Sequence, residues 1–253
     1  MSTPLGSSAR LRVGIIGSGR AGAVLGAALA RAGHPTVAVS AVSDASVNRA
    51  REMLPGVPIR DDVDVVAEAD LVVLGVPDDV LAGLVAGLAS AGAFHPGQVL
   101  VHLSPGEGIG VLEPAVAHDV LPVALHPAVA LAGRPSDLER LHGAVFAVTT
   151  LKSLRPLGEA LVLEMGGEPV WIEEEDRPGY CAALAAVREG LEGVLGAASR
   201  VLFDCGIADP RRALEPLVVS TLEDAFGTGS VARNPAAPAA VLPDRPTDPE
   251  DDE

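Results

Sequence analysis

Cysteine, basic residues and long apolar runs are scarce in this 253-residue sequence, and each scarcity excludes or disfavours certain classes of function. Cysteine occurs only at Cys181 and Cys205, without metal-site spacing, so we expect no metal centre, no disulfide framework and a cytoplasmic protein. Basic side chains number 18 against 34 acidic ones, and the formal charge of −16 argues against nucleic-acid and anionic-membrane partners. The longest apolar run, around residues 80–94, is too short to span a bilayer, which predicts a buried helix and no membrane partner.

The two ends of the chain are poor in the patterns that build a core. Residues 1–10 are polar, with no apolar stretch of signal-peptide length, so we expect a disordered N-terminus and no export. Residues 228–253 are rich in Pro, Ala and Asp without periodicity, which predicts a disordered acidic tail. Because 48% of the whole chain is apolar, the residues between these ends can form a substantial core.

The most informative stretch that is present runs from Val13 to Gly22 and reads Val-Gly-Ile-Ile-Gly-Ser-Gly-Arg-Ala-Gly. An apolar strand breaks into a glycine turn and then into a helix predicted over residues 21–32. In a dinucleotide-binding turn, Gly17 allows the bend, Gly19 lets the backbone approach a pyrophosphate and Gly22 lets the helix pack on the strand. We therefore expect NAD or NADP there; the alternative is a tight turn that binds no ligand.

The end of the second predicted strand, residues 36–42, bears on the choice of cofactor. An acidic residue there binds the ribose hydroxyls of NAD, whereas a basic residue favours the extra phosphate of NADP. The sequence offers Ser43 and Asp44, followed by Arg49 and Arg51, so the preference stays open. Asp44 is equally suited to cap the helix predicted over residues 45–54.

The remaining pattern predicts an α/β fold. Apolar runs typical of buried parallel strands alternate with helical stretches. Strands are predicted over residues 57–60, 71–76, 98–104, 121–127 and 144–149, and helices over 63–68, 80–91, 111–117, 154–164, 179–204 and 210–226; the helix over 154–164 leads to Pro169-Val-Trp-Ile. We expect a Rossmann-type doubly wound parallel sheet over residues 11–176 and a smaller, truncated all-helical domain over residues 177–227.

Ligands of such sheets collect outside the carboxyl ends of the strands, so polar side chains there are candidates for chemistry. His102 and Ser104 follow one predicted strand, and His126 lies at the end of the next. Hydride transfer needs a proton donor, and histidine is the usual one at neutral pH. The alternative for each histidine is a hydrogen bond to a loop carbonyl, and for Ser104 the start of a turn. The predicted cofactor-binding residues are Gly17, Ser18, Gly19, Arg20, Ala21, Gly22, Ser43, Asp44, Val76 and Pro77.

Five segments resemble a family of bacterial Rossmann-like oxidoreductases whose C-terminal domain, of unknown function, is similar to that of 6-phosphogluconate dehydrogenases. The segments are Arg12 to Gly22, Ala41-Val-Ser-Asp-Ala-Ser, Leu125-His-Pro-Ala, Leu161-Val-Leu-Glu-Met-Gly-Gly-Glu-Pro-Val and Arg177 to Leu184. The resemblance implies an NAD(P)-dependent oxidoreductase that acts on a small carbonyl, imine or hydroxy acid, such as a ketopantoate-like acid. A homodimer through the helical domain is expected by analogy with this fold class.

The chain departs from the family at positions that could hold a substrate. His102-Leu-Ser-Pro-Gly stands where the family has His-Thr-Ser-Gly-Ala, and Val129-Ala-Leu stands where it has Met-Thr-Phe. Cys181 replaces a histidine, and Glu189 replaces an asparagine. Glu189 is then a candidate proton carrier, with a solvated side chain beside Arg188 as the alternative.

These departures, together with a C-terminus that stops short of the family's last helices, leave two hypotheses. The first is an active oxidoreductase with an altered substrate. The second is a catalytically silent nucleotide-binding protein that acts as a sensor or interaction partner.

Overall fold

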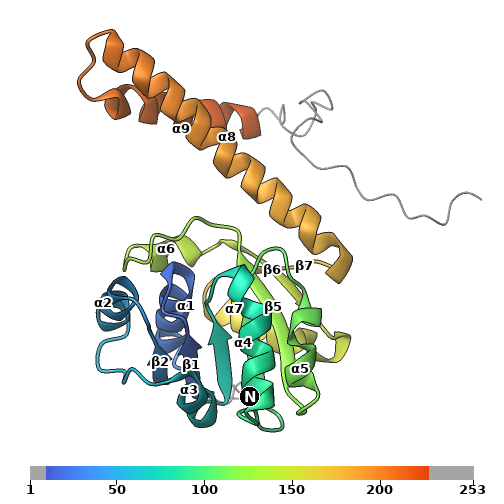
Figure 1. The fold of residues 1–253 in the computed structure, drawn as a ribbon. Helices are drawn as coiled ribbons and strands as arrows, with labels where there is room; N and C mark the ends of the chain where they lie inside the picture. Colours follow the sequence, from blue (N-terminus) through green and yellow to red (C-terminus); the bar gives the residue numbers. More distant parts are fainter. Residues whose placement is uncertain (1–9, 228–253) are drawn as a thin grey trace, which may run out of the picture. The chain divides into compact units, whose positions relative to one another are not determined.

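The computed structural model describes residues 10–227, which divide into two units (Figure 1). Unit 1 comprises Met1–Pro178 and unit 2 comprises Gly179–Glu253. The ends that the sequence predicts to be disordered, residues 1–10 and 228–253, lie outside the described residues except for Arg10.

Unit 1 is built on a seven-stranded sheet with the order β2-β1-β3-β4-β5-β6-β7. The strands are β1 (Val13–Ile16), β2 (Thr36–Ser40), β3 (Leu71–Leu74), β4 (Val99–His102), β5 (Leu121–Pro127), β6 (Val145–Thr150) and β7 (Glu168–Trp171). The Rossmann-type doubly wound sheet is confirmed, with one correction: β6 runs antiparallel to β5. The segment that follows β5 stays at the carboxyl edge of the sheet, so β6 starts from that edge (Figure 1).

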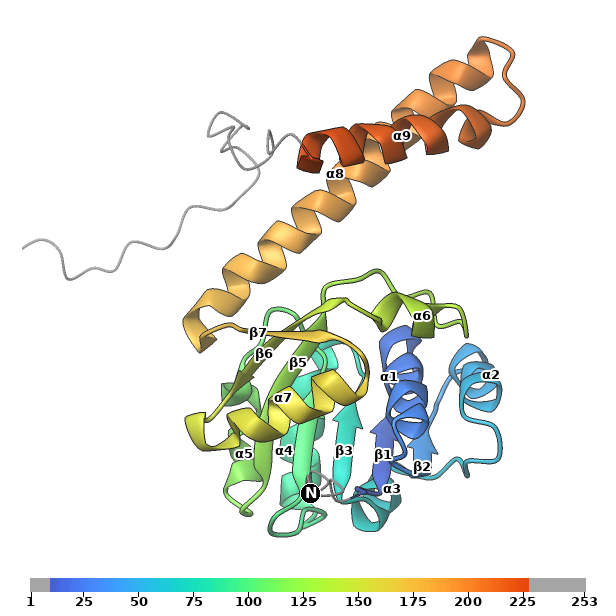
Figure 2. The ribbon, with the colours of Figure 1, turned by 180° about the vertical axis from the view of Figure 1, so that it is seen from behind.

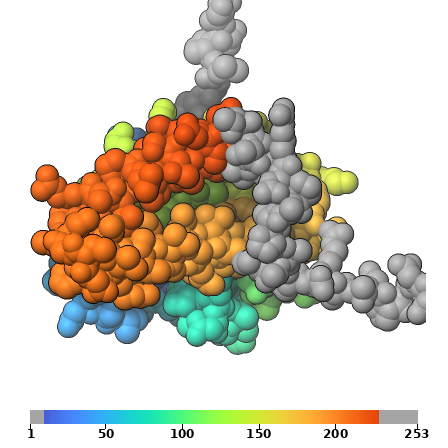
Figure 3. All heavy atoms as spheres, turned by 90° about the horizontal axis from the view of Figure 1, so that it is seen from above, coloured from blue at the N-terminus to red at the C-terminus, as the bar shows by residue number. Residues whose placement is uncertain are grey.

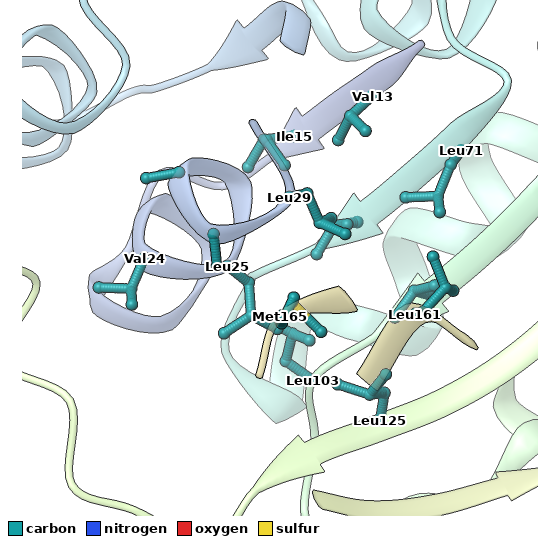
Figure 4. Close-up of a cluster of buried hydrophobic side chains, with 14 of the residues drawn as sticks. Val13, Ile15, Val24, Leu25, Leu29, Leu71, Leu103, Leu125, Leu161 and Met165 are labelled. Atoms are coloured by element: carbon teal, nitrogen blue, oxygen red, sulfur yellow. The ribbon is translucent and has the colours of Figure 1, made fainter. Parts of the chain in front are cut away.

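Helices cover both faces of this sheet. The first face carries α1 (Arg20–Arg31), α2 (Asp44–Met53), α6 (Asp137–Leu141) and α7 (Arg155–Glu164), as Figure 2 shows. The second carries α3 (Asp62–Glu68), α4 (Asp78–Ser90) and α5 (Glu113–Val116). The 3-10 helices are η1 (Ile109–Leu112), η2 (Lys152–Leu154) and η3 (Glu174–Asp176). Figure 4 shows how Leu25 and Leu29 of α1 meet Leu161 of α7 and Met165 over the first face.

Most predicted elements are present, with two local corrections. The strand predicted over residues 57–60 is only a single bridge between Val39 and Ile59. The cap of α2 is Ser43 rather than Asp44: the Ser43 Oγ accepts a hydrogen bond from the Ser46 N–H, and Asp44 is the first helical residue. A hydroxyl one position earlier thus meets the free N–H, while the Asp44 carboxylate interacts favourably with the helix dipole.

Unit 2 contains α8 (Arg177–Asp204), whose first two residues belong to unit 1, and α9 (Pro210–Gly227). The predicted smaller helical domain is confirmed. No residue between 179 and 227 is buried, and Figure 3 shows much of both helices, in light orange to red, at the surface. Within residues 10–227, none of the helices combines the length and apolar character needed to cross a membrane.

Three glycines bring β1, α1 and β3 together at the carboxyl edge of the sheet. A Cβ on Gly22 would lie 2.3 Å from the Gly17 carbonyl oxygen, and a Cβ on Gly75 would lie 2.7 Å from the same oxygen. Gly17 itself has a φ of +84°, which favours glycine. We call this contact the glycine crossing; it lets the start of α1 approach the ends of β1 and β3.

The glycine crossing gives a stability prediction. Gly22→Ala should lower the free energy of unfolding by about 2 kcal/mol or more, since the new methyl group meets backbone that cannot move freely. Gly87→Ala in the exposed part of α4 is the control, because a Cβ there has nothing within 4 Å. It should raise stability by about 0.5–1 kcal/mol. Urea unfolding measures both; similar effects of the two variants would contradict the crossing.

Candidate active site

The first part of the site is the N-terminus of α1, which is arranged to hold an anion. Gly19 is the N-cap residue, no side chain caps the helix, and its first turn contains no acidic residue. The first N–H groups of α1 therefore have no capping side chain, and the positive end of the helix dipole lies at the same place. A Cβ on Gly19 would lie 3.2 Å from the Gly75 carbonyl oxygen, so the N-cap residue lies close to the backbone that follows β3. This geometry fits a pyrophosphate.

The residues between these glycines have different environments. Ser18 is fully buried: its Oγ donates to the Ser46 carbonyl oxygen at 3.0 Å, and its N–H donates to the Ser40 carbonyl oxygen at 3.1 Å. Ser18 thus fixes the turn against the start of α2 and does not present its hydroxyl at the surface. Arg20 is exposed and Ala21 is half-buried in the first turn of α1.

A loop from the end of β5 reaches this turn. A Cβ on Gly133 would lie 2.4 Å from Arg49 Nε and 3.2 Å from the Arg20 Cα, so the loop and α2 meet beside the start of α1. Arg49 also donates to the Ser18 carbonyl oxygen at 3.1 Å. The buried Asp137 holds the loop, because one carboxylate oxygen accepts from the Gly133 N–H at 2.7 Å and from two neighbouring N–H groups.

The ends of β2 and β3 lie on either side of the glycine turn. The sequence predicts that the end of β2 faces the adenosine half of the cofactor and the end of β3 faces the nicotinamide half. Ser43 and Asp44 are exposed at the start of α2. Val76 is half-buried after β3 and Pro77 is the exposed N-cap residue of α4. Asp44 offers a carboxylate and Arg49 offers a guanidinium near the end of β2, so the side chains leave the choice between NAD and NADP open.

His102 and Ser104 lie at the end of β4 but point into the protein. His102 is fully buried; its Nε2 lies 2.8 Å from the Gly108 carbonyl oxygen, and its Nδ1 accepts from the Ser104 N–H at 3.2 Å. The Ser104 Oγ accepts from the Glu107 N–H at 3.2 Å. These contacts match the alternatives of a loop-bonded histidine and a turn-starting serine. They shape the turn of residues 104–110, which we call the β4 turn.

His126 is the accessible histidine of this edge. It is half-buried in β5, and burial together with the positive charge of Arg177 lowers its pKa to about 4. Burial likewise lowers the pKa of His102 to about 4. Both rings are therefore neutral at pH 7. An imidazolium is therefore not available at His126 at neutral pH.

Glu189 lies on α8 in unit 2, where its side chain is exposed. Its predicted role as a proton carrier remains a proposal. Among residues 10–227, no group of three or more His, Cys, Asp and Glu side chains could hold a metal ion.

Sequence reasoning missed three residues of this edge. Gly75 belongs to the glycine crossing, and its position directly after an apolar strand could have indicated it. Arg177 opens one of the five family segments, but nothing in the sequence indicated that it is fully buried, because a charged residue at a helix start is typical of the surface. Glu174 is one of four consecutive acidic residues, a pattern that favours a solvated surface, yet its carboxylate accepts from the Ile109 and Gly110 N–H groups.

Comparisons with known proteins agree with this architecture. Residues 3–127 match the family described as a Rossmann-like domain, and residues 144–235 match a domain of unknown function, DUF2520. A comparison with curated proteins found no match.

Solved structures share the fold at low sequence identity. A candidate NADP oxidoreductase from Bacteroides fragilis has a TM-score of 0.71 and 17% identity, covering 85% of this chain and 80% of that one. The NADP-bound pyrroline carboxylate reductase of Plasmodium falciparum has a TM-score of 0.62 and 15% identity, with 86% and 78% covered. An imine reductase from a Pseudomonas species has a TM-score of 0.63 and 18% identity, with 88% and 77% covered. At these identities the likeness establishes the fold.

The lowered pKa of His126 predicts a pH dependence of stability. Its value of about 4 in the folded protein compares with about 6.5 in an unfolded chain, so the unfolded state binds more protons between these values. The contribution of His126 to the free energy of unfolding is fully present above about pH 6.5 and is lost as the pH falls towards 4. Between pH 7 and pH 5, His126→Gln should lose about 1–2 kcal/mol less than wild type. Urea unfolding at the two pH values tests this, and parallel losses would contradict it.

Proposed function

Because the chain joins a Rossmann-like domain to a DUF2520 domain, we propose that it is an NAD(P)-dependent oxidoreductase acting on a small carbonyl, imine or hydroxy acid. The observation that carries the proposal is the uncapped start of α1 behind Gly19. Two structures with the same fold are named as a pyrroline carboxylate reductase and an imine reductase. Their names support a substrate with a C=N bond as a candidate, in addition to a keto acid such as a ketopantoate-like acid.

The proposal gives each part of the carboxyl edge a task. The bound cofactor supplies or accepts the hydride. The backbone of residues 17–22 holds the pyrophosphate, with Ser43 and Asp44 on the adenosine side and Val76 and Pro77 on the nicotinamide side. His126 orients the substrate as a neutral imidazole, while His102 and Ser104 act through the shape of the β4 turn. Glu189 of unit 2 stays a candidate proton carrier.

Cofactor binding tests this proposal. NADPH and NADH are titrated separately into wild type, Gly19→Asp and Gly19→Ala, with nicotinamide fluorescence as the readout. The Asp variant should weaken binding at least about tenfold, because its carboxylate repels the pyrophosphate at close range. The Ala variant controls for bulk and should weaken binding less, since its Cβ lies 3.2 Å from its nearest neighbour. Wild type that binds neither dinucleotide would refute the proposal.

The rival function is a nucleotide-binding sensor without turnover. The internal hydrogen bonds of His102 favour it, because they hold this ring against the β4 turn, and at pH 7 neither histidine carries the extra proton of an imidazolium. Both functions require cofactor binding. Turnover of any member of a panel of cyclic imines and 2-keto acids would exclude the rival, whereas binding without turnover of the panel would favour it.

The homodimer through unit 2 also remains part of the proposal. No residue between 179 and 227 is buried, and many of the large apolar side chains of this unit are exposed. Along α8, exposed side chains recur with the alternating spacing of four and three that lines helix–helix seams. Val187 is 62% exposed, Leu191 39%, Val194 68% and Val201 61%. A second copy of the same surface would cover this stripe.

A charge in the stripe should dissociate the dimer. Val194→Asp is expected to give a monomer at micromolar concentration, because a carboxylate at the centre of an apolar seam loses its hydration. Val63→Asp replaces another exposed valine, in α3 of unit 1, and should leave the mass unchanged. Light scattering after size exclusion measures the mass. A monomeric wild type, or a dimeric Val194→Asp variant, would refute this interface.

A further inference from the structure

The segment that leaves β7 and enters α8 is fixed to the β4 turn at two points. The first point is Arg177, whose guanidinium is fully buried. It donates to the carbonyl oxygens of Ser104 at 3.3 Å, Ala124 at 3.0 Å and Ala147 at 3.1 Å, and to Thr149 Oγ1 at 2.8 Å. One side chain therefore joins the start of the β4 turn to β5 and β6.

The second point is Glu174, three residues earlier. Its Oε2 accepts from the Ile109 N–H at 2.8 Å, and its Oε1 accepts from the Gly110 N–H at 2.9 Å. These are charge-assisted hydrogen bonds to the far end of the β4 turn. The neighbouring Glu173 pairs with Arg155 of α7 at 3.1 Å, which fixes the same segment to the first face of the sheet.

Gly108 makes room for this contact. A Cβ at position 108 would lie 2.1 Å from the Glu174 Cδ and within 2.3 Å of both its carboxylate oxygens. The backbone of Gly108 has a φ of −95° and a ψ of −154°, which alanine can adopt. Glycine at this position is therefore explained by the carboxylate that packs on it, and alanine would displace that flexible side chain without straining the backbone.

We propose that Glu174 is a positioning residue for the nicotinamide side of the site, acting together with Arg177 by clamping both ends of the β4 turn. The turn holds Ser104 and His102 at the carboxyl end of β4, next to the end of β3. The segment that connects unit 1 to unit 2 thereby sets the shape of the turn. This inference rests on the proposed function, because it assigns the turn to the cofactor's nicotinamide half.

A double-mutant cycle on Glu174 and Gly108 tests the clamp. Glu174→Ala, Gly108→Ala and the double variant are compared with wild type, and Glu175→Ala removes the adjacent exposed carboxylate as a control. Each variant is titrated with NADPH or NADH, whichever binds wild type more tightly, and with the matching fragment that lacks nicotinamide, 2′-phospho-ADP-ribose or ADP-ribose. Amide exchange of Ile109 and Gly110 is measured without ligand.

Three results are expected together. Glu174→Ala and Gly108→Ala each raise the Kd for the dinucleotide at least about fivefold, the lower end of typical coupling between sites. The double variant is no weaker than either single one, because both remove the same contact. The fragment Kd stays unchanged, and exchange of the two amides becomes at least about fivefold faster. Glu175→Ala behaves as wild type in every measurement.

The contrary results separate the two proposals. An equal loss for fragment and dinucleotide would mean a general structural role and would overturn the positioning role, as would additive effects of the two substitutions. Faster amide exchange with an unchanged dinucleotide Kd would also overturn it. If wild type binds neither dinucleotide, the proposed function fails and the positioning role fails with it.

Discussion

The glycine crossing is the constraint on which the rest of unit 1 depends. A helix can present its first N–H groups at the carboxyl edge of a sheet only if its backbone comes very close to the strands that precede and flank it. Gly17, Gly22 and Gly75 allow this approach, since each lacks the Cβ that would meet a neighbouring backbone or side-chain atom. The uncapped end of α1 and the packing of Leu25 and Leu29 on the sheet follow from the same contact.

The antiparallel direction of β6 is accompanied by a second constraint at the same edge of the sheet, which is the burial of a charged side chain. Where β5 and β6 meet, Arg177 is buried beside two histidines, and a buried cation requires many acceptors. Carbonyl oxygens from Ser104, Ala124 and Ala147 supply them. Burial is the main reason that the pKa values of His102 and His126 are lowered to about 4, and the positive charge of Arg177 lowers both further. One buried charge thus joins the β4 turn to β5 and β6 and adds to the effect of burial on the two histidines.

Much of the fold could be predicted because its signals are local. The glycine turn, the first helix and the apolar run of β3 each lie within about ten consecutive residues, and they specify strand, turn and helix directly. The contacts that complete the site are distant in sequence: Arg177 and Ser104 are 73 positions apart, and Glu174 and Ile109 are 65 apart. A single sequence carries no pattern for such pairs. The direction of β6 was missed for a similar reason, since it depends on where the preceding loop runs.

An acidic chain that is proposed to bind an anionic cofactor needs a local source of attraction. The formal charge of −16 acts over the whole surface, but salt screens exposed charges beyond about 8 Å. The start of α1 carries uncapped N–H groups and an exposed Arg20, and Arg49 lies beside it through the loop of Gly133. At contact distance these groups outweigh remote carboxylates. The overall charge therefore argues against polyanionic partners such as nucleic acids but not against a dinucleotide, whose pyrophosphate would meet only this local field.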